Sequence, residues 1–430
     1  MARIHAFKPY IFSKHHKSEL SRLIAPPYDD IKPAQLGQLK EGHVNNITHL
    51  TLPTGIGDEQ YSKASRTLKT WMEGEVLSQR SVEALYPYTQ RFVHPETGAE
   101  ITRIGFIAAL KLETFDAGIV LPHERTLSGP REDRLKLMGA THANLESIFG
   151  MFPDQDKIAS ELVWNLTTNN DPLLSAIDQS GIRHRVWEVT NRDVISSLIS
   201  LLDPLQVSIV DGHHRYETAL NYRDMWRAAH PEAGADHPVD SIMMYLAPMS
   251  DPGLVIMSTH RILHSLDTFD FDHMLEKLSK NFTISPWSSP LEGFDRLSEN
   301  AERTSFLLMT STRVVLISLK EGVSPEQLID SDLPSAIASL DVSLLHDYIF
   351  AKMLGISRAA QESQQNLSYA KSREDAITSL ADPSNQLVIG MNPTRFDQVE
   401  AVAQSGSVMP QKSTYFYPKL ASGLLVNSLD

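Results

Sequence analysis

The chain has 430 residues, with 39 Lys and Arg against 53 Asp and Glu, a formal net charge of −14 at pH 7, and no cysteine. A chain of this length is expected to fold as two or three units of roughly 150 residues each. Its acidic balance argues against a general duplex-DNA binder, which needs a cationic face. The lack of thiols excludes disulfides, Cys-zinc sites, iron–sulfur clusters and a cysteine nucleophile.

The composition, 41% hydrophobic and 21% charged, is that of an ordinary globular protein. The first residues, Met1–Pro9, lack the unbroken apolar core of a signal peptide. No stretch approaches the ~18 apolar residues needed to span a bilayer. We therefore expect a cytoplasmic protein with no membrane segment.

The first predicted elements surround a loop at Ala25–Asp30, where Pro26 and Pro27 exclude a continuous helix. Helical spacing of apolar residues predicts a helix over Gln60–Gln79. Two apolar runs, Leu85–Val93 and Ile101–Leu112, predict a β-hairpin.

Strands and helices continue to alternate further along the chain. The predicted strands are Gln206–Val210, Ser241–Ala247, Leu254–Ser258, Ser305–Met309, Val314–Leu319 and Gln386–Gly390. The predicted helices are Arg215–Ala229, Phe271–Lys280, Asp341–Leu354 (with Gly355 as its stop), Ser372–Leu380 and Arg395–Gln404. This alternation favours an α/β or α+β fold.

The sharpest local motif is Asp211–Arg215, where an apolar strand meets a glycine turn and a helix begins at once. The first N–H groups of a helix and its dipole favour bound anions, and the Arg215 guanidinium suits phosphate. Asp211 at the end of the strand could hold Mg²⁺ or receive a proton. The alternative is a capped helix with surface histidines at 213 and 214, and five consecutive chemically capable residues favour the site.

A second motif is Leu121–Thr126, in which Glu124 follows His123. A partly buried glutamate can act as a general base. Because position 127 is leucine, the motif is not the zincin pattern His-Glu-x-x-His. An exposed loop of mutually solvated charges is an equally good interpretation of these residues alone.

Two further motifs carry anion-binding residue types. Ser258, Thr259, His260 and Arg261 lie at the end of the predicted strand Leu254–Ser258, although a capped turn would have the same sequence. The stretch Gly406–Ser413 resembles a phosphate-binding loop, but Gln411 replaces the required glycine and Pro410 offers no N–H. We therefore reject a phosphate-binding loop at Gly406–Ser413 and interpret Gly406 as the residue that ends a helix. The segment is still basic and rich in hydroxyl groups, and it could contact a nucleotide or close over a pocket.

Five motifs together carry a resemblance to a known family. They are Ala25–Asp29, His123–Thr126, Asp211–Tyr216, Thr259–Arg261 and Met409–Lys419, in order along nearly the whole chain. The chain resembles a bacterial family of proteins of unknown function that is related to SerK-like free serine kinases, in the ParB/sulfiredoxin superfamily. The resemblance implies an α/β (α+β) fold with a ParB/sulfiredoxin-like core and additions at both ends. We expect an N-terminal α/β region at 1–110, the catalytic core at 111–265, an inserted α/β module at 266–340 and a C-terminal α/β region at 341–430.

The resemblance also implies roles for individual residues. It makes Glu124 the catalytic base, places Asp211, His213, His214 and Arg215 at the nucleotide phosphates, and makes Thr259, His260 and Arg261 a further anion site. From the motifs themselves we expect Asp211 to be catalytic and to hold Mg²⁺, and Gly212, Lys412, Ser413 and Thr414 to contact the nucleotide. We also expect His123, Tyr28 and Asp29 to contact the substrate.

The function that follows is phosphoryl transfer from ATP or ADP, with Mg²⁺, to a small hydroxylated metabolite, serine being the first candidate. The alternative is a ParB-like nucleotide-binding regulator or slow nucleotidase that has no small-molecule acceptor. A metal-dependent hydrolase is a third interpretation. The expected partner is a small-molecule substrate, and neither nucleic acid nor a membrane is expected to bind.

Overall fold

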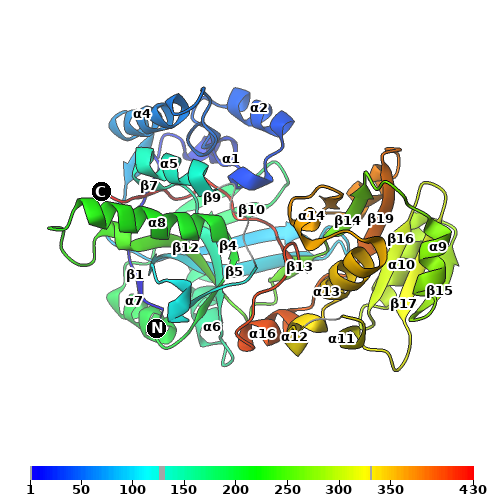
Figure 1. Cartoon of the computed structure of the whole chain (residues 1–430). Helices are drawn as coiled ribbons and strands as arrows, with labels where there is room; N and C mark the ends of the chain where they lie inside the picture. The colour runs from blue at the N-terminus through cyan, green and yellow to red at the C-terminus, as the bar shows by residue number, and fades with distance from the viewer. Residues whose placement is uncertain (1, 125–130, 330–331) are drawn as a thin grey trace. The chain divides into compact units, whose positions relative to one another are not determined.

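The computed structural model of the protein describes residues 2–124, 131–329 and 332–430. They form two compact units, residues 1–255 with 418–430, and residues 256–417 (Figure 1). The fold is mixed α/β, as the alternation of apolar patterns predicts. The predicted four-part division has other boundaries and stays a prediction.

The first unit is built on a large mixed sheet. In the part of the chain that the structure describes, the sheet has nine strands, in the order β6-β11-β8-β12-β5-β4-β10-β9, with β1 paired to β5. These strands are β1 (Ile4–His5), β4 (Tyr86–Val93), β5 (Glu100–Lys111), β6 (Val120–Pro122), β8 (Ile148–Phe152), β9 (Leu174–Ile177), β10 (Arg183–Val186), β11 (Val207–Asp211) and β12 (Ser241–Pro248). Two short pairs accompany it: β2 (Tyr10–Phe12) with β3 (Leu77–Gln79), and β7 (Ala143–Asn144) with β21 (Asn427–Ser428).

Helices surround this sheet. They are α1 (Leu20–Leu23), α2 (Pro33–Gly42), α3 (Thr48–Thr51), α4 (Glu59–Glu73), α5 (Arg131–Thr141), α6 (Ile158–Thr168), α7 (Arg192–Leu202) and α8 (His213–Ala229). Short 3₁₀ turns occur at Lys17–Glu19, Tyr28–Asp30, Phe115–Ala117 and Pro238–Asp240.

The predicted hairpin is confirmed as β4 and β5, which pair antiparallel from Tyr86 opposite Ile107 to Val93 opposite Glu100. Gly98 takes the left-handed conformation in the connecting turn, with φ of 69°. Both strands are buried over most of their length because β4 and β5 each have neighbours on both sides.

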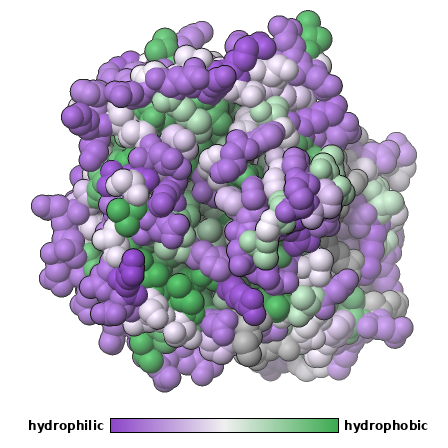
Figure 2. All heavy atoms as spheres, turned by 90° about the vertical axis from the view of Figure 1, so that its left-hand side faces the viewer, coloured by the Kyte–Doolittle hydropathy of each residue, from purple (hydrophilic) through white to green (hydrophobic). Residues whose placement is uncertain are grey.

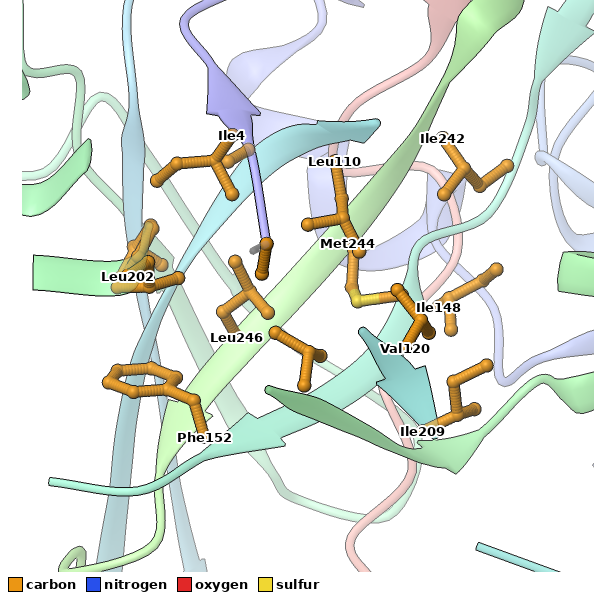
Figure 3. Packing of buried hydrophobic residues seen from close by; sticks show 14 of the residues in the cluster. Ile4, Leu110, Val120, Ile148, Phe152, Leu202, Ile209, Ile242, Met244 and Leu246 are labelled. Carbon is orange, nitrogen blue, oxygen red and sulfur yellow. The ribbon is translucent and has the colours of Figure 1, made fainter. Parts of the chain in front are cut away.

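The core of the first unit lies between the sheet and its helices. Apolar residues of β5, β8, β11 and β12 interdigitate there, among them Leu110, Phe152, Ile209 and Met244 (Figure 3). Helices α6, α7 and α8 each add buried residues to the same cluster. Burial of apolar area of this kind is the main favourable contribution to folding.

The second unit has an antiparallel sheet of six strands among the described residues, in the order β15-β17-β16-β19-β14-β18. The strands are β14 (His260–His264), β15 (Phe282–Trp287), β16 (Ser305–Met309), β17 (Val314–Leu319), β18 (Leu367–Ala370) and β19 (Asn385–Met391), and two short strands, β13 (Val255–Met257) and β20 (Tyr415–Tyr417), stand apart from this sheet. Its helices are α9 (Phe271–Leu278), α10 (Pro290–Glu299), α11 (Pro325–Leu328), α12 (Ser335–Ala338), α13 (Asp341–Ser343), the π-helix Leu344–Met353, α14 (Arg358–Glu362), α15 (Arg373–Ser379) and α16 (Phe396–Gln404). The predicted strands Ser305–Met309 and Val314–Leu319 are confirmed as β16 and β17, which pair antiparallel.

Two predicted helices differ from the structure. The helix expected over Gln60–Gln79 ends at Glu73, because Gly74 and the left-handed Glu75 turn the chain into β3. The helix expected over Asp341–Leu354 has the predicted extent, but it is a short α-helical turn followed by ten residues of π-helix. Gly355 ends it with φ of 71°.

The face of the molecule shown in Figure 2 is mainly hydrophilic, with hydrophobic side chains gathered in small areas. Within the described ranges, no helix is long and apolar enough to cross a membrane.

Gly253 provides a test of the packing of the first unit. A Cβ atom at this position would lie 2.3 Å from the carbonyl oxygen of Thr102 and 2.5 Å from the Cα of Arg103. Gly253→Ala is therefore expected to lower the free energy of unfolding by about 1–3 kcal/mol, since neither backbone atom can move freely. Denaturant unfolding measures this change.

The matched control is Gly139→Ala. Gly139 is an exposed residue of α5, and a Cβ atom there would meet nothing within 4 Å apart from the backbone of its own helix. Alanine at this position is expected to stabilise the helix by up to about 1 kcal/mol. Equal effects of the two substitutions would contradict the close approach at Gly253.

Candidate functional site

Two parallel strands bring the two sharpest sequence motifs together. β6 and β11 pair in parallel, with Val120 opposite Val207 and Pro122 opposite Ile209. The carboxyl ends of parallel strands meet at one edge of a sheet, where ligands bind in open α/β folds. His123 and Glu124 therefore leave the sheet beside Asp211 and Gly212.

Gly212 makes the tight turn from β11 into α8. It has φ of 90°, a left-handed conformation that glycine adopts without strain. A Cβ atom there would also lie 2.9 Å from Nη2 of Arg215. Glycine thus lets the Arg215 side chain fold back over the start of its own helix.

Arg215 joins two carboxylates at this helix start. Its Nη2 donates to Oδ2 of Asp211 at 2.9 Å, its Nη1 donates to the Ser147 carbonyl at 2.8 Å, and Nη1 lies 3.9 Å from Oε2 of Glu146. Burial alone would lower the pKa of Arg215, but the Glu146 and Asp211 carboxylates raise it above its usual value. The guanidinium therefore stays charged.

Lys419 completes the cluster from the far end of the chain. Its ammonium group donates to Oδ1 of Asp211, 208 positions earlier in the sequence. Both side chains are mostly buried, with 16% of Lys419 and 14% of Asp211 exposed. We name this group of Asp211, Arg215, Glu146 and Lys419 the charge cluster.

Two fully buried polar residues fix the backbone around Lys419. Gln90 donates to the Lys419 carbonyl at 2.8 Å, and Arg103 donates to the Pro418 carbonyl at 2.5 Å. Gln90 and Arg103 are both 0% exposed. The position of the Lys419 side chain thus depends on contacts of the sheet with the C-terminal segment.

The opposite charges hold each other ionised. Burial would raise the pKa of Asp211, but Lys419 and Arg215 hold it well below its usual range. Burial would lower the pKa of Lys419, but Asp211 raises it. Each charge is therefore paired across the whole neutral range.

His213 binds the segment that carries the candidate base. Its Nε2 accepts hydrogen bonds from the backbone N–H groups of His123 at 2.9 Å and Glu124 at 3.3 Å. Burial lowers the pKa of His213 to about 3, and burial also lowers the pKa of His123. The neutral His213 ring thus holds the base-bearing segment in place, and its Nδ1 is the ring atom that carries a proton.

The Ala25–Asp30 loop, which contains the paired prolines, contacts the charge cluster. The Tyr28 backbone N–H donates to Oε1 of Glu146 at 3.0 Å, and the Arg134 guanidinium lies 4.2 Å from the centre of the Tyr28 ring. Burial, with help from Asp29, raises the pKa of Tyr28 to about 12. Asp29 also raises the pKa values of Arg215 and Lys419.

The structure therefore brings most predicted residues of the first unit together and adds two that sequence reasoning missed. Those it gathers are Tyr28, Asp29, His123, Glu124, Asp211, Gly212, His213, His214 and Arg215. Glu146 and Lys419 were missed; Lys419 belongs to the Met409–Lys419 motif, which was the one signal available for it. Arg125 and Thr126 of the second motif lie outside the described residues.

The other predicted phosphate-binding residues belong to the second unit, where buried ones support local structure. Arg261 donates through Nη2 to the Lys412 carbonyl at 2.8 Å and through Nε to Nε2 of His346 at 3.4 Å. Nδ1 of His260 accepts from the Met391 N–H at 3.2 Å, and burial lowers the pKa of this histidine to about 3.

The loop of the last motif is held by the same unit. Thr394 donates to the Ser413 carbonyl at 2.7 Å, and Lys412 has φ of 55°. A small cavity of about 10 Å³ adjoins it, lined in part by Thr259, Arg261 and Ser413. Thr414 follows in the same loop. Gly406 closes α16 with φ of 68°, which confirms the prediction that it ends a helix.

The residues around Asp211 do not fit a resident magnesium ion. Asp211 lies between two cations, Lys419 and Arg215, which oppose a third positive charge at the same carboxylate. Among the described residues, no group of three His, Asp or Glu side chains could hold a metal ion. Mg²⁺ needs several oxygen ligands. The expected role of Asp211 as an Mg²⁺ ligand is therefore not supported by its surroundings.

Comparison with known families identifies the chain. Residues 4–343 match the family described as "Protein of unknown function (DUF1015)". The chain belongs to this family. No curated protein matches it.

Several solved structures are distantly similar. A conserved hypothetical protein from Pyrococcus furiosus is 12% identical over 70% of this chain and 87% of its own, with a TM-score of 0.34. A free serine kinase in complex with AMP is 13% identical over 70% and 84%, with a TM-score of 0.33. SbnI with a C-terminal truncation, from Staphylococcus aureus, is 9% identical over 75% and 87%, with a TM-score of 0.34. Similarities at this level carry no argument about activity.

The pair of Lys419 and Asp211 can be tested by a double-mutant cycle. Lys419→Met leaves Asp211 buried without one of its two cations, and removing one partner of a buried ion pair destabilises by about 3–5 kcal/mol. Adding Asp211→Asn is expected to restore much of this loss, measured as the free energy of unfolding.

The control is Lys412→Met, since Lys412 is an exposed lysine of the same motif. This change is expected to stay within about 0.5 kcal/mol. Additive effects of the two substitutions at 419 and 211 would contradict the pairing.

Because His213 is buried and neutral, we expect the folded protein to lose stability as the pH falls. Burial holds its folded-state pKa at about 3 against 6.5 ordinarily. Below pH 6.5 the unfolded chain binds a proton that the folded chain does not, so stability is lost as the pH falls from about 6.5 towards 3. The loss from this residue is about 1.4 kcal/mol per pH unit.

His213→Gln keeps an acceptor for the two N–H groups but cannot titrate. Denaturant unfolding at pH 7.5 and at pH 5.5 should therefore show a shallower pH slope for this variant than for the wild type. The exposed His15→Gln is the control and should keep the wild-type slope. An unchanged slope in His213→Gln would show that His213 is protonated in the folded protein.

Proposed function

We propose that this protein transfers a phosphoryl group from ATP or ADP to a hydroxyl group of a small metabolite, with serine as the first candidate. One observation carries the proposal. Lys419 and Arg215 meet at Asp211 at the start of α8, beside the segment that bears Glu124. The partner it implies is a small molecule and not nucleic acid.

Phosphoryl transfer depends on charge neutralisation and alignment more than on covalent help from the protein. The start of α8 supplies the positive end of the helix dipole, which favours a bound anion. Lys419 and Arg215 add two cations that are already positioned by Asp211. Preorganised charges of this kind stabilise a developing anion without further rearrangement.

Glu124 is proposed as the general base. The acceptor oxygen attacks the terminal phosphorus, the bond from that phosphorus to the bridging oxygen breaks, and the nucleotide leaves one phosphate shorter. The hydroxyl proton passes to the Glu124 carboxylate. His213 acts on this step by holding the Glu124 backbone, and His123 lies beside it.

We retain the remaining assignments as parts of the same proposal. Tyr28 and Asp29 contact the substrate, and Gly212 and His214 lie at the phosphates. For the second unit, the sequence-based assignment of Thr259, His260, Arg261, Lys412, Ser413 and Thr414 to nucleotide phosphates stays a separate prediction. Any Mg²⁺ would arrive with the nucleotide, because Asp211 is already paired with two cations.

The substitution Glu124→Gln is expected to slow phosphoryl transfer without changing nucleotide binding. Loss of a general base is expected to lower the transfer rate by roughly 10²–10⁴. Nucleotide affinity should be unchanged, since the substitution removes no cation from the charge cluster. Mass spectrometry of phosphoserine formed from serine with ATP or ADP measures the rate, and calorimetry measures the affinity.

The control is Glu132→Gln, because the Glu132 side chain is 81% exposed on α5. It should keep both the rate and the affinity. A wild-type rate in Glu124→Gln would mean that the assigned base is wrong. Nucleotide hydrolysis that no hydroxylated acceptor accelerates would favour the regulator or nucleotidase instead.

A further inference from the structure

A cavity of about 40 Å³ adjoins the charge cluster within the first unit. Arg215 and Glu146 form part of its lining. A single water needs about 10–15 Å³ of such space, so the cavity has room for a few atoms. Arg215 also binds Asp211 at 2.9 Å, so this one side chain belongs both to the wall of the cavity and to the charge cluster.

The walls of the cavity are largely apolar. Leu137 and Met138 come from α5, and Leu145 follows β7. Ile242 comes from β12, and Figure 3 shows it as part of the core cluster. Apolar walls favour an aliphatic group over a strongly hydrated one.

Three lining residues also carry buried polar atoms that have no hydrogen-bond partner among the described residues. They are Oγ1 of Thr51, Nδ2 of Asn144 and Oγ1 of Thr218. These side chains are 1%, 2% and 1% exposed. Leaving such an atom unsatisfied costs about 1–3 kcal/mol. A bound molecule with hydroxyl or amide groups would remove that cost.

The charged residues of the lining are already paired. Arg134 donates to Asp133 and to the Thr51 carbonyl at 2.7 Å. Glu146 accepts from the Tyr28 N–H and, at 2.7 Å, from the Ser422 hydroxyl.

Arg215 is paired with Asp211 in the same way. Apart from the phosphate contact proposed for Arg215, the charged side chains of the lining are held by opposite charges, so a charged arm inside the cavity would be desolvated without a partner of its own.

We propose that this cavity selects the acceptor, and that the acceptor bears a short, uncharged aliphatic arm with a hydroxyl or amide group. This inference rests on the proposed function. It predicts that an acceptor with an uncharged arm is preferred over serine. The groups that serine carries beyond its hydroxymethyl group, an ammonium and a carboxylate, are both charged. Within the small hydroxylated metabolites that the proposed function names, the cavity thus favours a polyol or a hydroxylated amide over serine.

The first test compares acceptors. Transfer from ATP or ADP is measured with L-serine and with 1,2,4-butanetriol, whose arm beyond the first two hydroxyl-bearing carbons is uncharged and ends in a hydroxyl. We expect kcat/KM to be roughly tenfold higher for the triol, the scale on which one added methylene is discriminated. An equal or higher value for serine would overturn the inference and leave the proposed function intact.

The second test uses Thr218→Val, which keeps the volume of the side chain and removes the unpartnered hydroxyl. It should weaken calorimetric binding of 1,2,4-butanetriol by roughly threefold to tenfold, the effect of one hydrogen bond. The control is Thr167→Val, a buried threonine of α6 that does not line the cavity and whose hydroxyl donates to the Trp164 carbonyl at 2.9 Å. Melting temperatures of both variants confirm that they fold.

The binding test also distinguishes failure of the cavity inference from failure of the proposed phosphoryl transfer. Triol binding that Thr218→Val weakens and Thr167→Val does not, in a protein that transfers no phosphoryl group, would support the cavity and refute the kinase. No binding by the wild type, or equal effects of the two variants, would mean that the cavity holds only water and would overturn the inference.

Discussion

The ion pair of Lys419 and Asp211 is the interaction on which the arrangement of the candidate site depends. Two mostly buried charges must be paired, because a lone charge in such a place is strongly unfavourable. The pair joins the C-terminal segment to the start of α8. Gln90 and Arg103 reinforce it, since they bind the backbone at Lys419 and Pro418 from the middle of the sheet.

Three other features of the candidate site each have their own physical cause. Parallel pairing of β6 and β11 puts the Glu124 segment beside the end of the other strand. The left-handed Gly212 lets Arg215 fold back onto Asp211. The neutral His213 accepts two backbone hydrogen bonds and so sets where Glu124 emerges. Buried charges of this kind add little net stability, and they suit a site that must meet an anion.

The second unit shows how residue types suited to anion binding can also serve the fold. The Arg261 guanidinium holds the Lys412 carbonyl, and His260 accepts a hydrogen bond from Met391. Both side chains are almost fully buried. A guanidinium with five donors in a fixed plane can join a loop to a sheet as readily as it binds phosphate.

The sequence by itself determined the features that depend on neighbouring residues: the β4–β5 hairpin, the strand, glycine turn and helix around Gly212, and the helix end at Gly406. These follow from local apolar periods and from backbone conformations that glycine adopts. The apolar spacing predicted the wrong end for the helix that starts near Gln60, because the spacing continues past Glu73 into β3. Only the tertiary structure decided that Lys419 reaches Asp211 across 208 positions, since that contact depends on distant strands packing against the C-terminal segment and on the burial of both charges. No local propensity encodes such a contact, because its free energy exists only once the surrounding core excludes water.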